Sequence, residues 1–291
     1  MAESALLIPT PASLALGRSA HSYIGPIPTL WAVVVEPFFV PSELGLIPGP
    51  KAVGPWATDM LHGRLLAGLA AWAIERDHGM DGFVPSRLTV DMFRTPPIEP
   101  AEVVTTLVRG GGRVRAMDAV VRMGGKDVSR ASALFLRTGD EPVDDPIAVS
   151  PDWDAPPADE LTADLGDDES FDVVSPLDRG FGAPGVRQAW IRDRRQLIRG
   201  VELTPFVRAA LAADLASPLA NFGAAGLDYI NADLTLHLGR LPEGEWIGTE
   251  TAHRVAAEGV AVAVCTLHDH RGPIGASTVC AVRNPRMAPN P

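Results

Sequence analysis

The chain has 291 residues, of which 46% are hydrophobic and 21% are charged, and this composition is typical of a folded globular protein rather than a disordered one. The length is sufficient for two domains. No apolar run reaches the roughly 18 residues that a membrane-crossing helix needs. The net charge of −11 is unevenly placed, because 14 acidic residues and no Lys or Arg lie between Asp140 and Asp178. No part of the sequence resembles the continuous basic surface that nucleic acids require, so we expect no nucleic-acid partner. Since no apolar run is long enough to cross a bilayer, we also expect no membrane partner.

The distribution of proline and charge divides the chain into four segments. Residues 1–35 are interrupted by prolines and are interpreted as an N-terminal extension. Residues 36–139 and 186–291 are the two expected domains. The acidic, Pro-rich segment between them, residues 140–185, is predicted to be a loose or extended linker, because like charges repel and proline blocks regular hydrogen bonding. Trp153 and Phe171 are its expected anchoring points.

Each of the two domains has the same predicted order of elements, a helix followed by four strands. Residues 60–75 carry apolar side chains at helical spacing, and residues 204–215 are the second helix, with Thr204 as its N-cap and Pro205 in the first turn. The expected strands are residues 86–93, 101–109, 114–123 and 128–137 in the first domain, and 232–238, 245–253, 260–268 and 274–283 in the second. Residues 123–126 and 270–273 are predicted hairpin turns.

Two pairs of segments repeat at nearly the same offset. Residues 88–96 match residues 234–242 at an offset of 146, and residues 131–134 match residues 276–279 at an offset of 145. This agreement indicates an internal duplication. A helix followed by an antiparallel meander, present twice, predicts an α+β fold in which each sheet wraps around its helix.

A short motif makes the pattern more specific. Asp233 is followed by Thr235, Arg240 and the pair Glu245-Trp246, and the first helix is entered through His62-Gly63. Together with the duplication, these residues resemble the acyl-CoA thioesterase II family. The resemblance implies a double hotdog fold, with two tandem units in one continuous sheet, and hydrolysis of an acyl-CoA without a metal or other cofactor.

Asp233 is the first candidate catalytic residue. Alternation along residues 232–238 places Asp233, Thr235 and His237 on one face of the strand and three leucines on the other. The resemblance implies that Asp233 activates water for attack on the thioester, with Thr235 within reach. A carboxylate suits this role because it accepts a proton from water. The alternative is a structural aspartate that accepts a local backbone hydrogen bond.

The step into the first helix is the second candidate. Gly63 would allow a ligand to approach the backbone, and the free N–H groups of a helix start favour negative charge, so this step is a candidate oxyanion hole with His62 beside the substrate. The alternative is that Gly63 only permits close packing of the helix on its sheet.

One departure from the family pattern bears on activity. The resembled enzymes carry a water-orienting Gln on the last strand, where this chain has Val279 or Cys280. Asn231, His237 or His62 would then have to position the water. The second hypothesis is therefore a non-catalytic protein that binds acyl-CoA or another hydrophobic ligand. A third is hydration or dehydration of an enoyl thioester, with Asp233 paired with His237 or His62.

Two cysteines, Cys265 and Cys280, cannot form a disulfide framework, so we expect a protein of the reducing cytoplasm. A duplicated chain already supplies the pairing of two units. Further assembly into homo-oligomers is left open by the sequence.

Overall fold

The computed structural model describes residues 35–55, 57–140, 153–161, 170–223 and 226–284. They all belong to one compact unit, Val35–Pro291. The expected extension, residues 1–35, lies outside the described residues except for Val35. Within the described ranges, no helix is long and apolar enough to cross a membrane.

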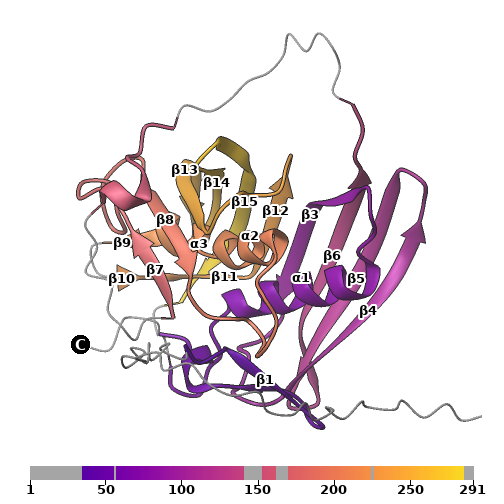
Figure 1. Ribbon diagram of the computed structural model, residues 1–291. Helices are drawn as coiled ribbons and strands as arrows, with labels where there is room; N and C mark the ends of the chain where they lie inside the picture. The colour runs from indigo at the N-terminus through magenta and orange to yellow at the C-terminus, as the bar shows by residue number, and fades with distance from the viewer. Residues whose placement is uncertain (1–34, 56, 141–152, 162–169, 224–225, 285–291) are drawn as a thin grey trace, which may run out of the picture. The chain divides into compact units, whose positions relative to one another are not determined.

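The first half of the described chain contains one long helix and six strands (Figure 1). The helix is α1 (Arg64–His78), and the strands are β1 (Phe39–Ser42), β2 (Gly45–Pro48), β3 (Phe83–Met92), β4 (Ala101–Gly110), β5 (Val114–Met123) and β6 (Lys126–Arg137).

The second half contains a broken helix and further strands. These are β7 (Phe171–Val174), β8 (Gln188–Asp193), α2 (Pro205–Ala213), α3 (Ala216–Asn221), β9 (Phe222–Gly223), β10 (Gly226–Leu227), β11 (Tyr229–Asn231), β12 (Asp233–Leu238), β13 (Trp246–Ala257), β14 (Val260–Asp269) and β15 (Gly272–Arg283). Short 3₁₀ helices occupy Pro50–Ala52 and Ala158–Glu160.

Among the described residues, thirteen strands form one sheet, in the order β1-β2-β4-β5-β6-β3-β12-β15-β14-β13-β8-β7, with β11 also paired to β15. All of its strand pairs are antiparallel. The order β4-β5-β6-β3 of the first half is mirrored by β13-β14-β15-β12 in the second. The prediction of an α+β fold with two helix-and-sheet units in one continuous sheet is confirmed.

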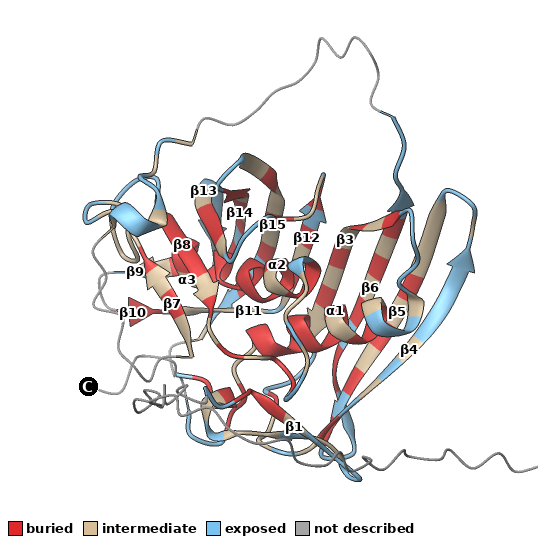
Figure 2. Cartoon of the chain, viewed as in Figure 1, coloured by how far each residue is buried: buried red, intermediate tan, exposed pale blue. Residues whose placement is uncertain are grey.

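The two units join through β3 and β12. Thr89 pairs with Thr235, and these residues are counterparts in the duplication, 146 positions apart. Their hydroxyl groups are hydrogen-bonded at 3.2 Å. The leucines and valine that alternate with them are fully buried, and buried residues alternate along β3 in Figure 2. The sheet is therefore apolar on the side that the helices cover. A local two-fold axis therefore passes close to the Thr89–Thr235 pair.

The helices lie on one face of the sheet and pack against each other. α1 contacts β3, β4, β5 and β6, whereas α3 contacts β13, β14 and β15. α1 also packs on α2, and a Cβ at Gly68 would lie only 2.6 Å from Leu211 Cδ2. Gly68 therefore allows the two helices to approach each other closely.

The second helix differs from the prediction, which placed one helix at residues 204–215. Thr204 does cap it, accepting a hydrogen bond from the Val207 N–H. The helix ends at Ala213, however, and resumes at Ala216. Pro218 has no N–H to donate to the Asp214 carbonyl four residues earlier, so the regular hydrogen-bond pattern is interrupted there. Asp214 consequently lies at a break in a buried helix.

The first helix starts later than predicted, at Arg64 instead of residue 60. The Leu61 N–H donates to the Pro96 carbonyl and the His62 N–H to the Ala52 carbonyl, both in neighbouring loops. These bonds hold the residues before Gly63 in an extended path.

Parts of the expected linker, residues 140–185, pack on the sheet, and they include both expected anchoring points, Trp153 and Phe171. β7 pairs with β8, and the buried carboxylate of Asp172 forms an ion pair with Arg192 at 2.7 Å. Trp153 stacks on His268 with ring centroids 4.3 Å apart and covers Gly248. Residues 141–152 and 162–169 of the expected linker lie outside the described residues.

A fully buried ion pair ties the two halves together. Arg64, the first residue of α1, donates to Asp193 at the end of β8 at 2.6 Å, and both side chains are about 1% exposed. The same guanidinium donates to the Leu211 carbonyl of α2 and lies 4.3 Å from the Phe171 ring centroid.

We predict that Arg64→Ala lowers the free energy of unfolding by about 3–5 kcal/mol, because it leaves the Asp193 carboxylate buried without its partner. The matched control is Arg130→Ala, which removes an exposed pair with Asp91 and should cost about 0–1 kcal/mol. Urea unfolding of both variants measures the difference. Equal losses would show that the buried pair contributes no more than a surface pair.

Candidate active site

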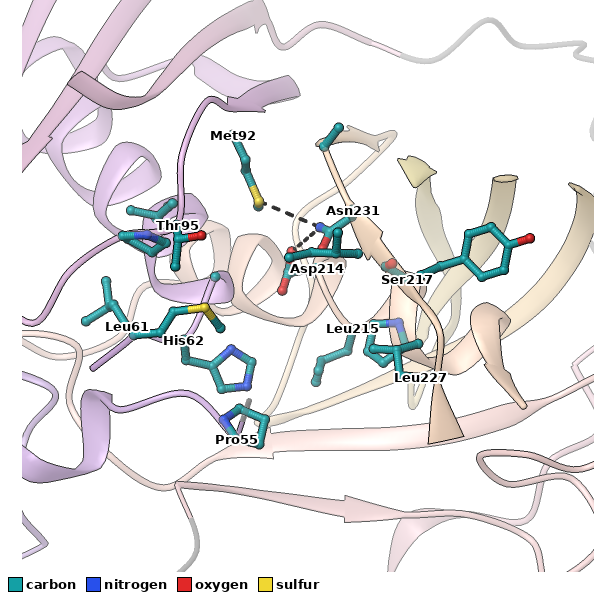
Figure 3. Close-up of a pocket in the computed structure, with 18 of the residues that line it drawn as sticks. Pro55, Leu61, His62, Met92, Thr95, Asp214, Leu215, Ser217, Leu227 and Asn231 are labelled. Atoms are coloured by element: carbon teal, nitrogen blue, oxygen red, sulfur yellow. Dashed lines mark hydrogen bonds between the residues drawn. The ribbon is translucent and has the colours of Figure 1, made fainter. Parts of the chain in front are cut away.

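A cavity of about 410 Å³ opens where the two units meet. Its walls come from the segment before α1, the end of β3, the α2–α3 break and β11 (Figure 3). Most lining side chains are apolar, such as Leu66, Phe181 and Leu227. The described residues that contribute polar side chains to it are few: His62, Asp214, Ser217, Tyr229 and Asn231, with Arg94 and Thr95 on the loop after β3.

Asp214 is the only carboxylate among the described residues that line this cavity. The residue is 5% exposed, and its Oδ1 accepts a hydrogen bond from Asn231 Nδ2 at 2.7 Å (Figure 3). Burial raises the pKa of the Asp214 carboxyl above its usual range, while the Asn231 hydrogen bond and the charge of Arg64 act in the opposite direction. The carboxylate is therefore more basic than a solvated aspartate.

Asn231 reaches the cavity because the strand is interrupted beside it. Asn231 pairs with Ala281 of β15 and Thr235 pairs with Thr278, so the stretch between them holds one residue more than the opposing stretch. The extra residue reverses which face the side chains point to. Asn231 thus faces the helices, although strict alternation would place it on the same face as Asp233.

The step into α1 brings His62 and Gly63, two of the candidate site residues, to the cavity. Gly63 is the N-cap residue of α1, and no side chain among the described residues caps this helix end. The Leu65 and Leu66 N–H groups donate to the carbonyls of His62 and Gly63, so the N–H groups of Gly63 and Arg64 are the ones left for a ligand. A Cβ at Gly63 would lie 3.9 Å from Asp214 Oδ2, which places this backbone beside the carboxylate.

His62 and Ser217 add two buried polar atoms without a hydrogen-bond partner, the Nδ1 of His62 and the Oγ of Ser217. Burial, and then the charge of Arg64, lower the pKa of His62 to about 3, so its ring is neutral at physiological pH. Such unpartnered groups in a cavity are free to bind a polar part of a ligand.

Asp233, the first candidate catalytic residue, is not among the described residues that line the cavity. Its Oδ1 instead accepts a hydrogen bond from the Cys280 N–H at 2.6 Å, which is the structural alternative stated above. Thr235 and His237 share its face of the sheet, opposite the helices, and Thr235 is bonded to Thr89. These three residues therefore lie on the wrong side of β12 for the cavity.

Val279 and Cys280, the candidates at the position of the family's Gln, also lie outside the cavity lining. Val279 is buried in the hydrophobic core, and Cys280 is exposed on the opposite face of β15. Of the predicted site residues, the structure brings together His62, Gly63 and Asn231.

Asp214 was missed by the sequence analysis, although a signal was present. It is a single carboxylate in an otherwise apolar, alanine-rich segment, Ala209–Ala216, which the structure buries. Burying a charge is costly, so an acidic residue in such a helix indicates a partner or a function. Its partner Asn231 is not recognisable from local sequence.

The described residues contain no group of three or more His, Cys, Asp or Glu side chains that could hold a metal ion.

We predict that Asp214→Asn raises the melting temperature at neutral pH. The folded-state pKa of Asp214 is raised above its unfolded value, so the stability linked to its protonation is complete in acid and is lost as the pH rises through the folded pKa. Asparagine does not ionise, so the variant avoids the free-energy cost of burying a charged carboxylate at neutral pH. The advantage should shrink toward zero in acid, where the wild-type carboxyl is protonated. Asp140→Asn, at an exposed position, is the control for melting curves across pH. An advantage that is independent of pH would contradict the assignment.

Two family models match the chain, one to each half. The acyl-CoA thioesterase N-terminal domain matches residues 52–136, and the acyl-CoA thioesterase C-terminal domain matches residues 146–279. Together they span about three quarters of the chain. No curated protein matches it in the corresponding search.

Solved structures share the fold at low sequence identity. A candidate thioesterase II from Thermobifida fusca is 19% identical, with a TM-score of 0.64 over 81% of this chain and 90% of that chain. The acyl-CoA thioesterase II TesB2 from Mycobacterium marinum is 18% identical, with a TM-score of 0.57 over 76% and 90%. A conserved protein with a hot dog fold from Alicyclobacillus acidocaldarius is 15% identical, with a TM-score of 0.61 over 79% and 89%.

The structural matches identify the fold as a double hotdog, and the two family models account for both of its halves. The chain therefore belongs to the acyl-CoA thioesterase II-like family.

Proposed function

We propose that the protein hydrolyses the thioester bond of an acyl-CoA, with Asp214 as the base that activates water. The observation that carries this proposal is a buried carboxylate of raised pKa, hydrogen-bonded to Asn231 inside a mostly apolar cavity. Membership of an acyl-CoA thioesterase family supports the substrate class.

In the proposed reaction, the substrate carbonyl lies between Asp214 and the start of α1. Asn231 uses its N–H₂ group to hold the carboxylate, which leaves its own carbonyl oxygen to accept a hydrogen bond from water. Asp214 accepts a proton from this water as its oxygen attacks the thioester carbon. The negative charge that develops on the carbonyl oxygen is stabilised by the N–H groups of Gly63 and Arg64 at the start of α1.

The tetrahedral intermediate then collapses, and the bond between carbon and sulfur breaks. The proton held by Asp214 passes to the departing thiolate, so the products are a carboxylic acid and free coenzyme A. The apolar walls hold the acyl chain and exclude bulk water, which strengthens the electrostatic contribution of Asp214 and of the helix end. His62 is neutral and does not neutralise the carboxylate.

We predict that Asp214→Asn lowers kcat for acyl-CoA hydrolysis by about 10²–10⁴-fold, the range typical for removal of a general base. Asp233→Asn is the matched control, because an asparagine there still accepts the Cys280 N–H and the residue lies outside the cavity. Thiol release is measured across acyl chain lengths. Equal rates for wild type and Asp214→Asn would contradict the role of Asp214. Wild-type binding of acyl-CoA without thiol release would instead support the non-catalytic hypothesis.

The pH profile is a separate expectation. Since only ionised Asp214 accepts a proton, kcat should rise with pH through the Asp214 pKa. Because burial raises that pKa, the increase in kcat should occur at a pH above the usual carboxyl range. Initial rates of thiol release, measured with a chromogenic thiol reagent at a series of pH values, would locate this increase. The rise should disappear in Asp214→Asn, and a rise that persists there would belong to another group.

A further inference from the structure

A second, smaller cavity of about 240 Å³ lies next to the first, and Phe222 lines both. Its polar walls are formed by Arg187, Asn221, Thr251 and Arg254. None of the described residues that line it carries a carboxylate. The cavity is therefore rich in hydrogen-bond donors and positively charged.

The two arginines are held in place by neutral groups. Arg254 Nε donates to Asn221 Oδ1 at 2.9 Å, and the guanidinium lies 5.5 Å from the ring centroid of Tyr229, which lines the first cavity. Arg187 donates to backbone carbonyls, including that of Leu219 at 2.8 Å. Within the described part of the chain, neither guanidinium forms an ion pair with a carboxylate.

Two further observations point to an anionic ligand. The Nδ2 of Asn221, which lines this cavity, is buried and has no hydrogen-bond partner among the described residues. The two guanidinium groups are also close enough that Arg254, after the larger effect of burial, lowers the pKa of Arg187. An anion would accept from the free amide and offset the repulsion between the two charges.

A bulge in β13 creates this arrangement. Thr251 pairs with Cys265, whereas His253 pairs with the next residue, Val264, so Ala252 is an extra residue in the strand. Thr251 and Arg254 are three positions apart and would face opposite sides of a regular strand. The bulge puts both on the side of α3, where Arg254 meets Asn221.

We infer that Arg187, Asn221 and Arg254 form an anion subsite that binds phosphate of the coenzyme A portion of the substrate. This inference rests on the proposed function. Asn221 ends α3, seven residues after Asp214 along the chain, and the next residue, Phe222, lines both cavities. A thioester bound at Asp214 carries its phosphates at the far end of a long pantetheine arm, so the two groups of the ligand would occupy adjoining cavities. Guanidinium groups are suited to phosphate oxygens because they donate in a planar fork.

Calorimetric titration of the full-length protein tests the subsite without requiring turnover. The probes are free coenzyme A, 4′-phosphopantetheine, which a carrier protein would present, and pantetheine, which has no phosphate. The test variant is Arg254→Gln, because Arg187 also supports backbone carbonyls. Arg254→Lys retains the charge, and Arg109→Gln removes an exposed arginine from β4 in the other half of the sheet. Melting curves establish that each variant is folded.

The expected result is that Arg254→Gln weakens coenzyme A binding by about tenfold to hundredfold, the range for lost hydrogen bonds to a charged group. Arg254→Lys should recover part of the loss, Arg109→Gln should bind like wild type, and added salt should weaken wild-type binding. Pantetheine binding should not change. If Arg254→Gln weakens 4′-phosphopantetheine binding by the same factor as coenzyme A binding, the result supports the subsite. The phosphate bound there is then the one that coenzyme A shares with the prosthetic group of carrier proteins.

The inference and the proposed function fail in different ways. Coenzyme A binding that depends on Arg254, without any hydrolysis, would support the subsite and remove the catalytic proposal. Hydrolysis with unchanged coenzyme A affinity and unchanged KM in Arg254→Gln would overturn the subsite and leave catalysis by Asp214 in place. Wild-type affinity for coenzyme A no greater than that for pantetheine would also overturn it.

Discussion

The antiparallel pairing of β3 with β12 is the constraint on which the rest of the structure depends. It joins two copies of one helix-and-sheet unit edge to edge, and it brings both helices onto the same face of one sheet (Figure 1). Only this arrangement places the start of α1 beside the break between α2 and α3. Gly63 from one copy and Asp214 from the other then share a cavity that neither copy could form alone.

The fold could be predicted because it is encoded in local and repeated patterns. The predicted strand at residues 232–238 agrees with β12, since its alternating leucines are buried as expected. The turn between β5 and β6 was also recognisable, because Gly124 and Gly125 both adopt positive φ as a tight hairpin requires. Strands such as β8, which follow the acidic segment, were missed because no repeated motif marked them.

The site was harder to predict because its residues depend on two irregularities. The motif resemblance assigned Asp233 to the site, and Asn231 was only a secondary candidate, because the extra residue that turns Asn231 toward the helices leaves no recognisable pattern in the sequence. The helix was predicted to be continuous, so the break that presents Asp214 was not anticipated. The motif residues have structural roles instead: Arg240 forms a two-point ion pair with Asp269, and Asp233 satisfies an N–H that the strand interruption leaves free.

The fusion of both units into one polypeptide removes a restriction that identical subunits would face. In an assembly of two identical chains, every change made in one cavity is repeated in its symmetry mate. Here the carboxylate of Asp214, the proline that interrupts its helix and the bulge that turns Arg254 toward α3 all belong to one copy. One polypeptide can therefore carry a single reaction centre in its second unit, while the residues of its first unit change independently to complete the cavity.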